Sequence, residues 1–80
     1  MNIYYNFNGI KKLADARRWL EQTKNPHIIR IDGVLYSIYQ MRVFKVVRCG
    51  YISADIEVAS YNDAVKWVYK HRKAINERFR

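Results

Sequence analysis

Cysteine and proline each occur once in the 80 residues, and glycine occurs three times. The lone Cys49 excludes an internal disulfide and is typical of a reducing compartment. Gly9, Gly33 and Gly50 are scattered, which excludes a glycine-rich phosphate-binding loop. No uncharged apolar run approaches the ~20 residues of a membrane helix, and the first residues lack the basic start and apolar core of a signal peptide. We therefore expect a cytoplasmic protein without membrane contact.

Acidic side chains are also scarce. Seven Asp and Glu stand against fifteen Lys and Arg, which gives a formal net charge of +8. This balance favours anionic partners in general: nucleic acid, an acidic protein surface or anionic lipid. Half of the residues are hydrophobic and 15% are aromatic, which is too apolar for a disordered chain. We expect one small basic domain over residues 1–80, able to bury only about 60% of its surface.

Groups that could carry catalysis or bind metal are few. The two histidines are His27 and His71, and no carboxylate stands at metal-ligand spacing from either. Cys49 lies in a predicted turn beside Arg48, with no base indicated that could activate the thiol. A ribonuclease whose His, Tyr, Lys and Arg side chains converge in the fold is an alternative. We predict a non-enzymatic protein with no catalytic residues, no metal and no cofactor.

The clearest secondary-structure pattern starts at Ile52. Apolar and polar residues alternate from Ile52 to Val58, which predicts a strand with one buried face. Ser60 can cap a following helix, and Asp63 has the spacing of a capping box. This helix is predicted from about Tyr61 to Glu77. Its apolar stripe consists of Ala64, Val65, Val68, Ile75 and Phe79.

A second helix is predicted near the start of the chain. Asn8 can cap a helix from about Gly9 to Thr23, which ends before Pro26 because the residue preceding proline avoids the helical region. Its apolar stripe consists of Ile10, Leu13, Ala16 and Leu20. Residues Asn2–Phe7 alternate loosely and predict an additional N-terminal edge strand.

The middle of the chain predicts antiparallel strands. Asp32-Gly33, between the β-rich runs 27–31 and 34–39, is a strong hairpin signal. Residues 43–47 are strand-like again, but no Gly, Pro or Asn marks a turn at 40–42. One strand over 34–47 would span about 45 Å, far beyond the ~12 Å radius of a compact domain. We expect a bend, bulge or turn there, or else a long strand that reaches into a second subunit.

The connection before Ile52 determines which residues of the preceding strand enter the core. A three-residue loop, Arg48-Cys49-Gly50, places Phe44 and Val46 on the core face. A two-residue loop would bring Lys45 into the core instead, so the longer loop is preferred. The predicted fold class is α+β with two layers: an antiparallel meander of three or four strands, with an extra N-terminal edge strand as an option and two helices on one face.

With both helices on one face, the opposite face of the sheet is predicted to be bare and too apolar to be merely solvated. Tyrosines there could stack on bases while cations contact phosphates, as in open-sheet recognition of single strands. The predicted binding residues are Arg30, Leu35, Tyr39, Val43, Lys45, Val47, Arg48 and Tyr51. A cross-strand pair with Asp55 is an alternative role for Lys45. A secondary basic stripe for phosphate contacts consists of Lys66, Lys70 and Lys73.

These features predict a binding module for RNA or DNA that uses the basic, aromatic sheet face and the basic helix surface. The alternative is a small protein-binding inhibitor or adaptor that acts through the apolar sheet face, and a homodimer through that face is a further option. The order helix, strands, helix resembles double-stranded RNA-binding domains. Their second helix opens with a lysine cluster, where this chain has Ser60-Tyr61-Asn62-Asp63, so no function is carried over.

Overall fold

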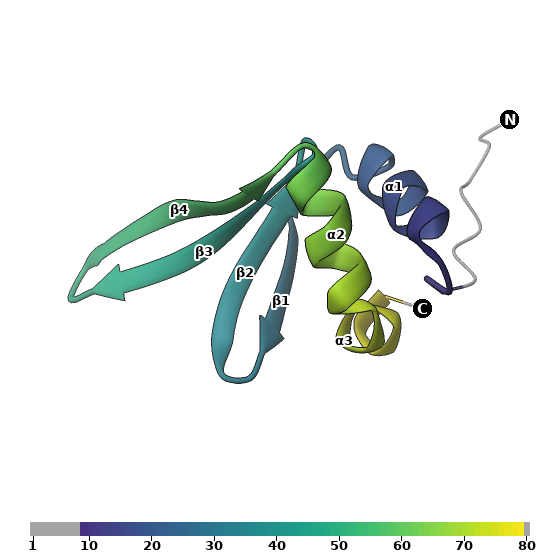
Figure 1. The fold of residues 1–80 in the computed structure, drawn as a ribbon. Helices are drawn as coiled ribbons and strands as arrows, with labels where there is room; N and C mark the ends of the chain where they lie inside the picture. The colour runs from purple at the N-terminus through teal and green to yellow at the C-terminus, as the bar shows by residue number, and fades with distance from the viewer. Residues whose placement is uncertain (1–8, 80) are drawn as a thin grey trace, which may run out of the picture.

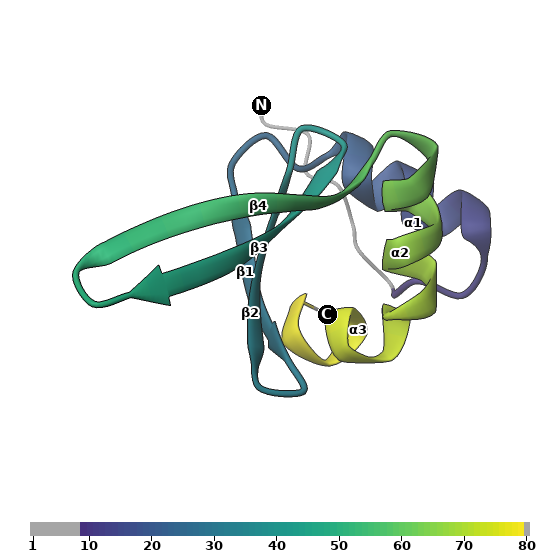
Figure 2. The same ribbon diagram turned by 60° about the vertical axis from the view of Figure 1, so that its left-hand side comes forward.

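A computed structural model describes residues 9–79 and has an α+β fold (Figure 1). The elements are α1 (Leu13–Glu21), β1 (His27–Ile31), β2 (Val34–Tyr39), β3 (Arg42–Cys49), β4 (Ile52–Ser60), α2 (Asn62–Lys70) and α3 (Arg72–Phe79). The strands form one antiparallel sheet in the order β1-β2-β3-β4. The three helices lie on one side of it (Figures 1 and 2). The predicted two-layer meander is confirmed, whereas the strand predicted at residues 2–7 and the Asn8 cap lie outside the described residues.

Two-residue turns connect the neighbouring strands. Asp32 and Gly33 both have positive φ, and so do Gln40 and Met41, with φ of 51° and 61°. Positive φ at both central residues is typical of a type I′ turn. The region without a turn signal is therefore a tight hairpin turn, and the chain forms no continuous strand over residues 34–47. The Met41 carbonyl accepts a hydrogen bond from the Tyr61 amide at 2.9 Å, and the Met41 side chain packs against the core. These contacts hold a turn that lacks the usual Gly or Asn.

This turn reverses the predicted faces of β3. Ile38 pairs with Val43 and Tyr36 pairs with Lys45, so Val43 points into the core and Phe44 points to the open face. The next loop also differs from the prediction, because Cys49 pairs directly with Ile52 across Gly50 and Tyr51. The predicted three-residue loop and the core positions of Phe44 and Val46 were wrong.

A β-bulge in β4 joins the exposed and buried parts of that strand. Val43 pairs with Ala59 and Phe44 pairs with Glu57, which leaves Val58 as the extra residue. Ala59 thereby enters the core, although Ile56 lies on the same side of the sheet only three residues earlier. The side chains of β4 alternate as predicted up to the bulge, but the predicted buried face is wrong: Ile52 to Val58 are all exposed, and only Ala59, beyond the bulge, is buried.

The core lies between the helices and the inner face of the sheet. Its buried residues are Ile10, Ala16, Trp19, Leu20, Ile29, Ile38, Val43, Ala59, Ala64, Val65, Val68 and Ile75. Most of the predicted helix stripes are thus confirmed. Leu13 is the exception, since 49% of its surface is exposed, and Phe79 is partly buried against the core.

The helix boundaries differ from the prediction at three points. α1 begins only at Leu13, where the Asp15 carboxylate accepts the backbone amides of Lys11 and Lys12 at 3.0 and 3.1 Å. Ser60 is the last residue of β4 rather than a helix cap, and no side-chain cap bond is present at the N-cap residue Tyr61. The predicted last helix is divided at His71 into α2 and α3.

The hairpin of β3 and β4 extends beyond the rest of the sheet (Figures 1 and 2). The pairing of β2 with β3 ends at Tyr36 and Lys45, whereas β3 and β4 stay paired as far as Cys49 and Ile52. The part beyond Lys45, residues 46–55, is called the arm below. It projects away from the helices, so both of its faces lie outside the core.

Candidate functional site

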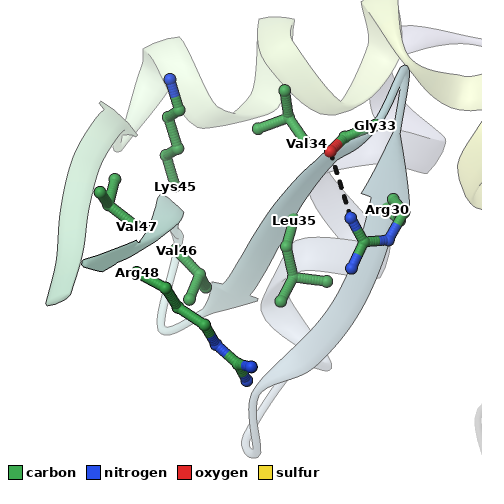
Figure 3. A pocket seen from close by; sticks show the side chains of 8 residues that line it. All are labelled: Arg30, Gly33, Val34, Leu35, Lys45, Val46, Val47 and Arg48. Carbon is green, nitrogen blue, oxygen red and sulfur yellow. Dashed lines mark hydrogen bonds between the residues drawn. The ribbon is translucent and has the colours of Figure 1, made fainter. Parts of the chain in front are cut away.

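A groove lies where the β1–β2 hairpin and the arm diverge (Figure 3). Its volume is about 410 Å³, within the range of ligand pockets in proteins. It is lined by Arg30, Gly33, Val34, Leu35, Lys45, Val46, Val47 and Arg48. Because the β2–β3 ladder ends at Lys45, the strand edges that face each other across the groove have no ladder bonds between them.

Both faces of the sheet contribute to the lining. Lys45 pairs with Tyr36 and Ile56, so its side chain lies on the helix side of the sheet, as does that of Val34 (Figure 3). Leu35, Val46 and Arg48 point the other way, towards the open face (Figure 3). The groove therefore offers aliphatic walls with cationic groups on both sides of the gap between the strands.

The charges in the groove are all positive. Arg30, Lys45 and Arg48 line it, and none of the lining residues is acidic. The Arg30 guanidinium is oriented by its own hairpin, because its Nη1 donates to the Gly33 carbonyl at 3.1 Å (Figure 3). Among residues 9–79 the ion pair present joins Arg42 to Glu57, with 3.6 Å between Nε and Oε1. The groove cations Arg30, Lys45 and Arg48 are not part of this ion pair.

The alternative role predicted for Lys45, a cross-strand pair with Asp55, is wrong. Lys45 lies opposite Ile56, and Asp55 lies opposite Val46. Directly paired residues share a face of the sheet and neighbours along a strand alternate, so Lys45 and Asp55 point to opposite faces. Lys45 is exposed and does not neutralise the acid across the strand.

Two aromatic rings extend the open face beyond the groove. Tyr39 and Phe44 stack with 5.0 Å between ring centroids and 29° between ring planes, and both are partly exposed. They lie along the same two strands, β2 and β3, that form the groove. Phe44 was missed as a surface residue because no Gly, Asn or Asp marks the turn at residues 40–41. Counting a two-residue turn there would have placed it on the open face.

The structure brings most of the predicted binding residues together. Arg30, Leu35, Lys45, Val47 and Arg48 all line the groove, although Lys45 and Val47 lie on the helix side rather than the open face. The remaining three are elsewhere. Tyr39 is on the open face beside Phe44, and Tyr51 is fully exposed at the tip of the arm.

Val43 was assigned to the wrong face. It is completely buried, with 0% of its surface exposed. Its strand partners are the core residues Ile38 and Ala59, so it contributes to the packing of the helices on the sheet. Val43 is a core residue and is not part of a binding surface.

The secondary basic stripe is divided between two helices. Lys66 and Lys70 lie on α2, and Lys73 lies on α3 beyond the break at His71. All three are exposed, but they belong to the helical layer and none lines the groove. They form a cationic surface separate from the groove.

The two histidines, which were considered for catalysis and metal binding, both pack against aromatic rings. His27 contacts the rings of Trp19 and Phe79, at centroid distances of 5.4 and 5.1 Å, and His71 stacks on Trp67 at 4.1 Å. Within the described range no group of three or more His, Cys, Asp or Glu side chains could hold a metal ion. Over residues 9–79 no helix has the length and apolar character needed to cross a membrane.

Comparisons of the chain with protein-family models, with curated proteins and with solved structures found no match. The groove and the open face therefore provide the basis for a functional argument.

Proposed function

We propose that this protein is a non-enzymatic nucleic-acid-binding module that holds a single strand in the groove between β2 and β3. The observation that carries the proposal is the presence of three cations, and no acidic residue, in the lining of one groove. A nucleic-acid backbone supplies a row of phosphates, and each phosphate contact releases counterions that add to affinity. The formal charge of +8 further raises the rate of encounter with a polyanion.

Arginine is well suited to this role. Its planar guanidinium can donate two parallel hydrogen bonds to one phosphate. The hydrogen bond from Arg30 to the Gly33 carbonyl restricts one guanidinium before binding, which reduces the side-chain entropy lost on binding. Arg48 approaches from β3 in the arm and Arg30 from β1 of the other hairpin, so the two guanidinium groups reach the groove from its two sides.

The stacked Tyr39–Phe44 pair favours a single strand over a duplex. Unpaired bases can stack on aromatic side chains, at about 1–3 kcal/mol per base, whereas bases inside a duplex cannot reach a flat sheet surface. The pair lies on the same strands as the groove. A strand with phosphates in the groove can therefore place a base against these rings.

The proposal is tested by fluorescence anisotropy with labelled single- and double-stranded RNA and DNA of equal length, at two salt concentrations. The variant Arg30→Gln/Arg48→Gln removes two groove charges, and Lys66→Gln/Lys70→Gln removes the same charge from the helical layer. We expect the groove variant to bind at least tenfold more weakly than wild type. The slope of log affinity against log salt should also become shallower, its magnitude decreasing by about 1.4 for two lost phosphate contacts at ~0.7 each on single strands.

The helix-layer variant should lose much less affinity. Equal losses in both variants would contradict the assignment of binding to the groove. Failure of all four nucleic acids to bind at low salt would refute the proposal as a whole.

A further inference from the structure

β4 is a sheet edge that none of the described elements covers. It is the last strand in the order β1-β2-β3-β4 and spans nine residues. Ile52 to Val58 are all exposed, and this stretch contains neither Lys nor Pro. Its charged residues are Asp55 and Glu57, and the bulge lies at its end, at Val58. Edge strands are usually blunted by Lys or Pro or covered by another element, because their free amides and carbonyls readily pair with another strand.

One side of this strand is also apolar. Ile52, Ala54 and Ile56 alternate on the side that faces the helical layer, and Ile52 and Ile56 are 72% and 52% exposed. Val47 lies directly across from Ala54 on β3. The helices do not reach this far along the arm (Figures 1 and 2). Burial of Ile52 and Ile56 therefore requires a contact from outside the described chain.

The hairpin geometry indicates which backbone groups are free. Cys49 and Ile52 flank a two-residue turn, and residues in that position exchange hydrogen bonds with each other. Because hydrogen-bonded and non-hydrogen-bonded pairs alternate along an antiparallel ladder, the backbone of Ala54 points to β3. The amides and carbonyls of Ser53, Asp55 and Glu57 point to the open edge.

We propose that β4 pairs with β4 of a second copy of this chain, antiparallel, about a two-fold axis that passes through Ala54. In this register Ser53 and Asp55 of one copy exchange backbone hydrogen bonds with Asp55 and Ser53 of the other. Ile52 of each copy lies opposite Ile56 of its partner. The pairing closes after two chains, because each chain uses its own β4 edge once.

Charge selects this register among the neighbouring ones. A two-fold axis at Asp55 would place the two Asp55 carboxylates opposite each other, and an axis at Ile56 would place each Asp55 opposite a Glu57. Like charges directly opposite across strands are destabilising. An axis at Ser53 avoids these contacts but loses the pairing of Ile52 with Ile56. Of these registers, only the one centred on Ala54 both pairs the isoleucines and places no acid directly opposite another.

The inference does not depend on the proposed function. The residues involved lie on β4, and the groove lining contains none of them. Salt also acts with the opposite sign: two chains of charge +8 repel each other, so screening should strengthen their association, whereas salt weakens binding to nucleic acid. Failure of one proposal is therefore distinguishable from failure of the other.

Analytical ultracentrifugation of wild type, Ile56→Lys and Ile28→Lys tests the dimer. Ile28 is a matched control, because it is a partly exposed isoleucine on the opposite edge strand, β1. We expect wild type to dimerise more tightly at high salt, Ile56→Lys to weaken the dimer at least tenfold, and Ile28→Lys to leave it within about twofold. A wild-type monomer at all concentrations, or an open-ended series of oligomers, would overturn the inference.

Cysteine cross-linking tests the register and does not rely on a destabilising variant. In a Cys49→Ser background, Ala54→Cys should form a disulfide-linked dimer under mild oxidation, because the two Cα atoms of a non-hydrogen-bonded pair lie about 4.5 Å apart. Ser53→Cys in the same background should not, since it lies opposite Asp55 of the partner. Cross-linking through position 53 but not through position 54 would overturn the register.

Discussion

Replacing Asn76 with Ala should destabilise the fold far more than its position in a C-terminal helix implies. The side chain connects both ends of the described chain: its Oδ1 accepts the Ile10 amide at 2.7 Å and its Nδ2 donates to the Ile10 carbonyl at 3.1 Å. Ile10 is only 2% exposed, so water cannot readily replace these bonds. Two lost hydrogen bonds at about 1 kcal/mol each, with a further cost for the unpaired backbone groups, amount to roughly 2–3 kcal/mol.

The matched control is Asn62→Ala, since Asn62 accepts a single 3.5 Å contact from Arg17 at an exposed site and should cost less than about 0.5 kcal/mol. Equilibrium urea unfolding measures both variants. Thermal unfolding should show Asn76→Ala melting about 8 °C or more below wild type, at about 4–8 °C per kcal/mol for a domain of this size. An Asn76→Ala variant within 0.5 kcal/mol of the control would refute the view that this side chain anchors the N-terminal residues to α3.

Three further substitutions, and Val47→Lys as a control, test other parts of the fold. Tyr61→Gly should raise the free energy of unfolding by about 1 kcal/mol, because Tyr61 has a φ of 54° and a ψ of −121°, a backbone conformation that glycine adopts without strain. Denaturant midpoints measure the change, and a loss of stability would contradict this reasoning. Asp15→Ala should remove a pH-dependent part of the stability. Hydrogen bonds from the Lys11 and Lys12 amides lower the Asp15 pKa below its usual 3.8, so the stabilisation is complete above that pH and disappears as the pH falls through the folded-state pKa. The variant should be less stable than wild type at neutral pH and equal to it in acid, as measured by urea titrations at both. Val43→Lys should lower the free energy of unfolding by about 3 kcal/mol or more and unfold the domain, because a charge would enter the core. Circular dichroism measures this, and the control Val47→Lys should keep a native spectrum.

Local signals in the sequence account for much of the fold. Asp32-Gly33 predicted the β1–β2 hairpin because both residues tolerate positive φ. The helical stripes placed Ala16, Leu20 and Val68 in the core, where they are found. These successes rest on interactions within one element or across one turn, which neighbouring residues determine.

The faces of β3 could not be predicted because the signal for its turn is not local. Gln40 and Met41 both adopt positive φ without being Gly, Asn or Asp, and a sequence reading therefore finds no turn there. The turn is stabilised from far along the chain, by the amide of Tyr61. A shift of one residue exchanges the two faces of a strand, so this single turn moved Val43 into the core and Phe44 out of it.

The groove was also beyond prediction, because no residue type specifies where two hairpins separate. Its position follows from the unequal lengths of the strands: β1 and β2 have five and six residues, and β3 and β4 have eight and nine. Beyond Lys45 the strand β3 has no β2 residue paired with it. Arg30 and Arg48 were predicted as binding residues on a flat sheet face, but their common groove exists only because the longer hairpin diverges.

The arm therefore links the two proposals through a single structural cause. Its extra length leaves the inner edge of β3 unpaired at the groove and carries the outer edge of β4 past the helices that would otherwise cover its isoleucines. A continuous sheet formed about a two-fold axis perpendicular to it keeps the open faces of both chains on the same side, so pairing through β4 would present two cationic grooves to one polyanion.

Such a dimer should bind a strand long enough to reach both grooves more tightly than a short one, through the high effective concentration of the second groove. Ile56→Gln, which weakens the same isoleucine contact without adding a charge opposite the groove residue Lys45, should abolish that length dependence without changing the affinity for a short strand, as measured by anisotropy titrations with strands of increasing length. A length dependence that persists in this variant would show that β4 pairing does not supply the second site.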